Sequence, residues 1–170
     1  FGESINVSGK LASSIKKRPL PNTSDLNDVT SEDVCLANIE ISNYSSNLIP
    51  CQVSLSSISK NGRGFSLEIY GSEGSLILKS ENQKDYVHGF NLKYSNNENK
   101  IQNLTADSSF NFEKTWTDGR IAPVLRIQNL WAQSIMNGTP VIPGLCEGLA
   151  SHKVCEAIRE SSKSGLSIKI

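Results

Sequence analysis

The sequence lacks the features that mark nucleic-acid-binding and membrane-spanning chains. Its 170 residues carry 17 basic and 17 acidic side chains, so the formal net charge is zero. A balanced charge provides no electrostatic attraction to nucleic acid or to an anionic membrane surface. No apolar run approaches the ~20 residues that a membrane-spanning helix needs, and no secretory signal pattern opens the chain. We therefore expect neither a nucleic-acid partner nor a membrane partner.

Metal-binding and disulfide patterns are missing as well. The four cysteines, Cys35, Cys51, Cys146 and Cys155, form no C-x-x-C pair, and neither histidine completes a metal-ligand spacing with them. We interpret them as small apolar side chains of a protein in the reducing cytoplasm. The sequence thus predicts no metal site and a cytoplasmic location.

Catalytic patterns are also absent. No Ser-His-Asp order stands in a suitable local setting, and no pair of carboxylates stands out. His88 falls on the aromatic face of an expected strand, which favours a packed or interface histidine over a catalyst. The chain begins at Phe1 with residues typical of one element leading into a strand, so we expect it to be a piece of a longer protein.

The most informative stretch that is present covers residues 64–79, GFSLEIYGSEGSLILK. Its apolar and polar residues alternate on both sides of Gly71-Ser72-Glu73-Gly74, which predicts a strand, a tight turn and a second strand. Gly74 is placed to take the positive φ that closes such a hairpin. A phosphate-binding loop would lead from a strand into a helix, so this glycine pattern does not indicate one.

The remaining patterns predict further strands, followed by two helices. Residues 16–31 hold two prolines and many turn formers, which predicts a long loop, and Pro50 indicates an edge or a bulge in its strand. This order favours an α+β fold, a largely antiparallel open sheet with helices packed on one face and the other face available for dimerisation. The expected strands cover 3–15, 33–41, 47–58, 86–94, 100–105 and 166–170, and the expected helices cover 120–137 and 145–162.

Three segments resemble one known family. LEIYGSEGSLIL (67–78) is similar to a hairpin in the C-terminal domain of the glucose–fructose oxidoreductase / inositol dehydrogenase / MocA (Gfo/Idh/MocA) family. Residues 143–170 resemble the final helix and last strand of that family. The opening Phe1-Gly2-Glu3 resembles the segment that follows its catalytic helix.

The resemblance implies that residues 1–170 are a single C-terminal domain for substrate binding and dimerisation, without the N-terminal Rossmann domain. The full-length protein would be a dehydrogenase that uses NAD or NADP on a sugar, cyclitol or related polyol. It would form a homodimer or tetramer through the sheet. The G-x-G-x-x-G turn, the Lys-Pro pair and the Asp-x-x-x-His pattern of the family are absent from this sequence. The resemblance therefore carries over no catalytic and no cofactor-binding residue, and the piece alone is expected to be inactive and to bind no cofactor.

The best candidates for substrate contacts precede the first helix. Trp116, Asp118 and Arg120 combine an aromatic face with polar groups, which suits a sugar or cyclitol. Arg18, in the basic run that starts the long loop, is the runner-up. Ordinary packing or a helix-end charge is the alternative explanation for the first three residues, and a solvated face is the alternative for Arg18.

The sequence is also compatible with a second class of function. Because the chain shows no catalytic pattern, it is also compatible with a non-enzymatic α+β binding or assembly module. The two hypotheses differ in what the native polypeptide encodes upstream of Phe1.

Overall fold

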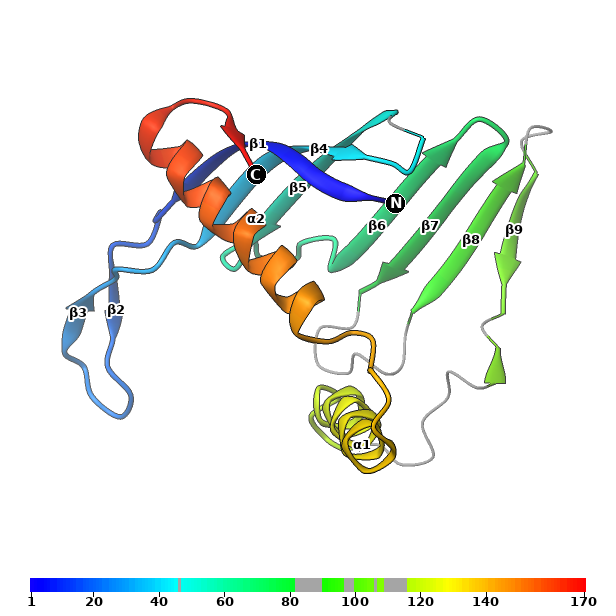
Figure 1. Cartoon of the computed structure of the whole chain (residues 1–170). Coiled ribbons are helices and arrows are strands. Elements are labelled where there is room, and N and C mark those ends of the chain that lie inside the picture. Colours follow the sequence, from blue (N-terminus) through cyan, green and yellow to red (C-terminus); the bar gives the residue numbers. More distant parts are fainter. Residues whose placement is uncertain (46, 82–89, 97–99, 106, 109–115) are drawn as a thin grey trace. The chain divides into compact units, whose positions relative to one another are not determined.

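The computed structural model describes residues 1–45, 47–81, 90–96, 100–105, 107–108 and 116–170 (Figure 1). Antiparallel sheets and helices confirm the α+β prediction. The chain forms two compact units, one made of Phe1–Lys60 with Ile142–Ile170 and the other of Asn61–Val141. The elements in chain order are β1 (Glu3–Ala12), β2 (Lys17–Pro19), β3 (Leu26–Asp28), β4 (Val34–Ser42), β5 (Leu48–Ser56), β6 (Phe65–Gly71), β7 (Gly74–Ser80), β8 (Asn91–Asn96), β9 (Ile101–Leu104), α1 (Ile121–Asn137), α2 (Leu145–Ser164) and β10 (Ile168–Lys169).

The first unit is built on a four-stranded sheet in the order β10-β1-β4-β5. Every neighbouring pair is antiparallel, and β4 lies between β1 and β5. The central position of β4 agrees with its sequence, which is partly apolar on both faces. The strand that carries Pro50 lies at the edge of this sheet, where a residue without an N–H group removes no ladder hydrogen bond.

Helix α2 covers one face of this sheet (Figure 1). The odd-numbered side chains of β4, and those of β1 from Val7 onward, point towards it, because successive side chains of a strand alternate between faces. Val7 is fully buried there, and Gly9 leaves room for the helix, since a Cβ at Gly9 would meet Ile158 Cγ2 at 2.9 Å. The buried core residues are Val7, Ala37, Ile39, Ala157 and Ile158.

Two serines of α2 complete the hydrogen bonding of β1. Gly9 N–H donates to Ser161 Oγ at 2.9 Å, and Leu11 N–H donates to Ser162 Oγ at 2.9 Å. The buried Ser161 hydroxyl in turn donates to the Leu166 carbonyl at 2.6 Å. Serine hydroxyls of the helix therefore satisfy backbone groups of β1 beyond its short pairing with β10.

The segment 16–31 differs from the loop that its prolines and turn formers predict. It holds the short strands β2 and β3, which pair antiparallel with each other as a separate two-stranded sheet. All six strand residues are exposed. Propensity alone misses this ribbon, because three-residue strands lie below the length at which alternation is visible.

The second unit holds a four-stranded antiparallel sheet in the order β6-β7-β8-β9. The central hairpin is confirmed, with Gly71 opposite Gly74. Gly74 has φ +157°, and a Cβ there would lie 2.2 Å from the Ser95 carbonyl oxygen, so no other residue fits without a shift. The predicted strand over 86–94 is confirmed only from Asn91, because 86–89, with His88, lie outside the described residues.

Both predicted helices are confirmed, and each ends at a glycine in the left-handed conformation, Gly138 for α1 and Gly165 for α2. The apolar pattern of α2 predicts that Leu149 faces inward, and this is wrong, because Leu149 is 57% exposed. All four cysteines are free, with Cys146 and Cys155 exposed and Cys35 and Cys51 packed against the core. Neither helix, nor any other in the described part of the chain, has the length and apolar character needed to cross a membrane.

Candidate functional site

Asp118 and Arg120 meet just before α1. The Arg120 guanidinium donates from Nη2 to Asp118 Oδ2 at 2.6 Å and from Nε to Asp118 Oδ1 at 2.9 Å. The Arg120 backbone N–H also donates to Asp118 Oδ1 at 3.0 Å. Trp116, two residues before, is half-buried. Two of the predicted substrate-contacting residues, Asp118 and Arg120, therefore form a bidentate ion pair at the start of a helix.

The hydrogen bonds from Arg120 lower the pKa of the Asp118 carboxyl to about 2, so the carboxylate stays ionised throughout the physiological range. A carboxylate at a helix N-terminus also interacts favourably with the helix dipole. These contacts match the alternative of a helix-end charge pair. A contact with substrate stays a prediction for these residues.

Arg18 lies in β2, in the exposed ribbon of the first unit. Its positive charge contributes, as the smallest cause, to a lowered pKa of Asp33. The other three candidates belong to the second unit. Of the four predicted residues, the contacts bring together Asp118 and Arg120.

Asp33, which no sequence pattern singles out as functional, holds the base of the ribbon formed by β2 and β3. The buried Asp33 carboxylate accepts hydrogen bonds from the backbone N–H groups of Ser14 at 2.7 Å and Ile15 at 2.8 Å. Those two bonds lower the pKa of Asp33. The Asp33 carbonyl also accepts from Ser57 N–H at 2.9 Å. One residue therefore joins the end of β1 to the segments around β4 and β5. An aspartate between a polar loop and a strand was the only available signal.

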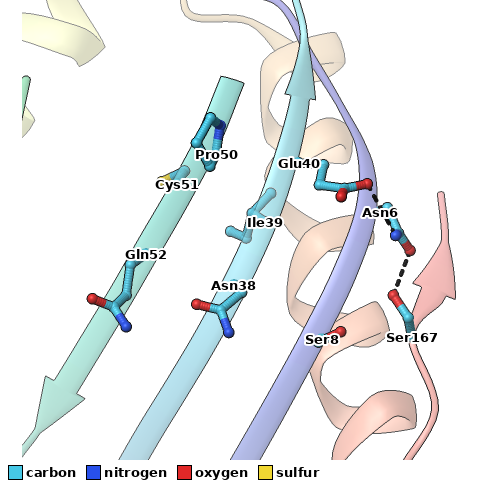
Figure 2. Close-up of a pocket in the computed structure, with 9 residues that line it drawn as sticks. All are labelled: Asn6, Ser8, Asn38, Ile39, Glu40, Pro50, Cys51, Gln52 and Ser167. Carbon is cyan, nitrogen blue, oxygen red and sulfur yellow. Dashed lines mark hydrogen bonds between the residues drawn. The ribbon is translucent and has the colours of Figure 1, made fainter. Parts of the chain in front are cut away.

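A shallow hollow lies on the face of the first sheet opposite α2 (Figure 2). Its volume is about 300 Å³. Asn6 Nδ2 donates to Glu40 Oε2 at 3.1 Å, and Ser167 Oγ donates to Asn6 Oδ1 at 2.6 Å, as the dashed lines in Figure 2 show. Asn38 and Gln52 are cross-strand partners on β4 and β5. The floor is thus formed by neighbouring strands.

The chemistry of the hollow is that of neutral hydrogen-bonding groups with one carboxylate. Asn and Gln side chains both donate and accept hydrogen bonds, as do serine hydroxyls. Such a face suits hydroxyl-bearing molecules, water, or a second protein surface of the same kind.

The central turn and the starts of the two described helices differ from a dinucleotide-binding loop. The glycines of the central turn lead into strand β7, so they offer no helix N-terminus to a pyrophosphate. The starts of both described helices are already occupied by carboxylates. Asp118 accepts from Arg120 N–H before α1, and Glu147 accepts from Gly144 N–H before α2. Either carboxylate would repel a phosphate.

Within the described ranges, no group of three His, Cys, Asp or Glu side chains is placed to hold a metal ion. His152 lies on the exposed side of α2, with its Nε2 3.8 Å from Glu156 Oε1. His152 is therefore a surface residue within the described part of the chain.

A model of one protein family matches the chain from end to end. It describes the C-terminal alpha/beta domain of the Gfo/Idh/MocA oxidoreductase family and covers residues 1–170.

Individual proteins give the same picture. An uncharacterized oxidoreductase of Synechocystis sp. is 36% identical over 162 residues, which is 95% of this chain and 43% of the relative. The chain thus spans less than half the length of the curated relative it matches. Among solved structures, levoglucosan dehydrogenase in complex with NADH and L-sorbose matches with a TM-score of 0.70 and 16% identity, over 99% of this chain and 46% of that one. The transcriptional regulator Gal80p from Kluyveromyces lactis matches with a TM-score of 0.65 and 13% identity, over 98% of this chain and 40% of that one.

Proposed function

Because the chain belongs to the Gfo/Idh/MocA oxidoreductase family, whose C-terminal alpha/beta domain it matches over residues 1–170, we propose that it is the C-terminal domain of an NAD(P)-dependent oxidoreductase. The match over the whole chain is the observation that carries this proposal. The substrate of the full-length enzyme is a sugar, cyclitol or related polyol. The ligands NADH and L-sorbose of levoglucosan dehydrogenase, a neighbour in fold, support this choice.

In this proposal the chain shapes the substrate pocket and supplies no catalytic residue. The nicotinamide cofactor, NAD or NADP, carries the hydride and is held by an N-terminal Rossmann domain of the longer protein. Trp116 offers an aromatic face to the substrate, and the pair Asp118 and Arg120 offers polar groups beside it. Arg18 is the second choice. The carboxylates at the starts of α1 and α2 support the expectation that this domain alone binds no dinucleotide.

The open face of the sheet serves self-association in this proposal. Sheet faces that are neither solidly charged nor covered by a helix suit pairing with an identical surface, which in a two-fold dimer is self-complementary. The polar hollow on the first sheet would be enclosed by such pairing. We expect a homodimer or a tetramer.

The protein is placed in the cytoplasm in this proposal. All four cysteines are free thiols, and two of them pack against the core. Free thiols in and beside a core suit a reducing compartment.

The activity is tested on the full-length protein from its native gene. We expect at least one member of a panel of sugars, cyclitols and polyols to be oxidised with reduction of NAD or NADP. The absorbance of the reduced nicotinamide measures this reaction. Calorimetry of the 170-residue chain with NADH should show no binding. Tight binding of NADH by this chain alone would contradict the division of roles.

The pocket residues are tested with a matched pair of tryptophans. Trp116→Leu should raise the KM for the polyol about 3–10-fold, because an aromatic contact contributes about 0.5–1.5 kcal/mol. Trp131→Leu, on α1, is the control and should leave KM unchanged. If the two variants had equal KM values, Trp116 would not be a substrate-contacting residue.

A non-enzymatic binding or assembly module is the second candidate. The likeness in fold to a transcriptional regulator favours keeping it, since the same fold serves different functions. The coding sequence upstream of Phe1 separates the two candidates. G-x-G-x-x-G, Lys-Pro and Asp-x-x-x-His in that order would support the enzyme, and a start codon within a few residues of Phe1 would support the module.

A further inference from the structure

The chain holds two Asn-Gly pairs, and the structure gives them different surroundings. Asn61-Gly62 lies in the connection between β5 and β6, and both residues are exposed. Asn137-Gly138 is also exposed, but it forms the end of α1. Asn61 has a left-handed backbone with φ +53°, whereas the φ of Gly62 is not positive. The two pairs therefore share their chemistry and differ in how their backbone is held.

Hydrogen bonding separates the two pairs. The Gly138 N–H donates to the Ser134 carbonyl at the end of α1. Neither the Gly62 N–H nor the Asn61 side chain has a hydrogen-bond partner within the described ranges. An N–H group that already donates must lose that bond before its nitrogen can react. The Gly62 nitrogen is therefore accessible to a reaction from which the Gly138 nitrogen is protected.

The reaction open to Asn61 is an intramolecular attack on its own side chain. The Gly62 backbone nitrogen loses its proton and bonds to Asn61 Cγ, the Cγ–Nδ2 bond breaks, and ammonia leaves, which closes a five-membered succinimide ring. Water then opens the ring at either carbonyl and gives aspartate or isoaspartate. The net change is the uptake of water and the release of ammonia, without oxidation or reduction. Glycine favours the attack because it has no Cβ beside the nitrogen and its backbone rotates most freely.

The charges next to Asn61 favour the same reaction. Lys60 and Arg63 flank the pair, both are exposed, and neither makes an ion pair with a residue that the structure describes. Removal of the amide proton leaves a negative charge on the nitrogen, and positive charge nearby stabilises that state. The residues that flank the second pair, Met136 and Thr139, are uncharged.

We propose that Asn61 is a site of spontaneous deamidation in the folded protein, with water as the co-reactant, and that Asn137 is protected. The proposal goes beyond the proposed function and does not depend on it. The product carries an added negative charge where the first segment of the first unit ends, at Lys60, and the second unit begins. Isoaspartate also lengthens the main chain there by a methylene group. Because ring opening does not restore the amide, the modified form accumulates with the age of the molecule.

The test incubates the folded full-length protein at mildly alkaline pH and follows both pairs by peptide mass spectrometry. The peptide with Asn61 should show the mass change from amide to acid, as a mixture of aspartate and isoaspartate. Asn61 should react at least about tenfold faster than Asn137, because the hydrogen bond at the helix end keeps the Gly138 nitrogen from the geometry of attack. The rate should rise with pH, since the attacking nitrogen must lose its proton.

Unfolding the protein is the control for the effect of sequence alone. In guanidinium chloride the hydrogen bond at the helix end is lost, and the salt screens the charges near Asn61. Asn61 and Asn137 should then react at similar rates, because each is followed by glycine.

A variant of the attacking residue tests the chemical step. Gly62→Ala should slow the reaction at Asn61 about tenfold, since a methyl group would stand beside the attacking nitrogen. Alanine suits the folded backbone there, because the φ of Gly62 is not positive. Circular dichroism checks that the variant is folded.

Asn22 is an internal comparison in the folded protein. It is exposed and left-handed like Asn61, with φ +64°. The next residue is the β-branched Thr23, whose N–H donates to the Leu20 carbonyl at 3.2 Å. Asn22 should therefore stay unmodified while Asn61 reacts.

The outcomes separate this proposal from the proposed function. If Asn61 reacts in guanidinium chloride but not in the folded protein, the fold protects it and the proposal is overturned. Equal rates at Asn61 and Asn137 in the folded protein would also overturn it. A Gly62→Ala variant that reacts as fast as the wild type would overturn the succinimide step. A full-length protein without dehydrogenase activity would contradict the proposed function alone, because none of these measurements uses that activity.

Discussion

The two units differ in how the apolar face of each sheet is covered. In the first unit α2 packs on the sheet, and Val7 at its centre is fully buried. In the second unit the face made by Phe65, Leu67 and Leu76 keeps these side chains 47%, 45% and 37% exposed within the described part of the chain. Neighbouring strands are hydrogen-bonded in both sheets, so the main difference lies in side-chain burial.

This difference indicates where stability comes from in each unit. Burial of a large apolar side chain contributes about 1.5–3 kcal/mol relative to its exposure. The first unit gains this contribution from its own helix. Order in the second sheet depends more on its turn geometry and its ladder of hydrogen bonds. Substitutions matched between the units can therefore sharpen or break the comparison.

The largest effect is expected from truncation of a core side chain. Val7→Ala should lower the free energy of unfolding by about 2–3 kcal/mol, because it removes buried methyl groups and leaves a cavity. Leu67→Ala should cost less than about 1 kcal/mol, since its side chain is half exposed. Urea unfolding of both variants measures the two values. Equal costs would show that Leu67 is covered as well as Val7 and would break the comparison.

The turn of the second unit is tested next. Gly74→Ala should destabilise by about 1–3 kcal/mol, because a Cβ would lie 2.2 Å from the Ser95 carbonyl oxygen at a positive φ. Gly71→Ala, whose Cβ would be no closer than 3.5 Å to any neighbouring atom, is the control. Thermal unfolding of the two variants gives the difference. A neutral Gly74→Ala would mean that turn geometry contributes little to this sheet.

A smaller cost is expected where α2 meets the edge of β1. Ser161→Ala removes the acceptor of Gly9 N–H and should cost about 1–2 kcal/mol, since a buried donor is left without a partner. Hydrogen exchange at the Gly9 amide should accelerate. Ser151→Ala, whose hydroxyl donates to the Glu147 carbonyl in an exposed position, should change neither quantity. If the Gly9 amide exchanged at the same rate in Ser161→Ala as in the wild type, the Ser161 hydroxyl would not be the group that protects it.

The smallest effect is a change in the pH dependence of stability. The pKa of Asp33 is lowered in the folded state, mainly by the N–H groups of Ser14 and Ile15. Its contribution to stability is therefore present above the unfolded-state value near 3.8 and is lost as the pH falls through the lower folded-state value. Asp33→Asn should be less stable than the wild type at neutral pH, and this difference should shrink on acidification. Unfolding midpoints measured between neutral and acid pH decide this, and a constant difference would contradict it.

The candidate sites divide in the same way between what local sequence predicts and what distant contacts create. Asp118 and Arg120 are two residues apart, so their pairing needs only the geometry of a helix start. The row of Asn6, Glu40 and Ser167 joins residues that are 34 and 161 positions apart. No periodicity in a single segment predicts such a row, because it depends on which strands are neighbours.

The sequence by itself determined the central hairpin, the ends of both helices and the edge position of the strand with Pro50. Those features follow from the steric limits of glycine and proline and from alternation within one segment. Only the tertiary structure decided that Asp33 holds the ribbon, that Ser161 satisfies Gly9 and that Leu149 is exposed. These depend on which surfaces meet, since a side chain is buried, or finds its hydrogen-bond partner, only where another element approaches it.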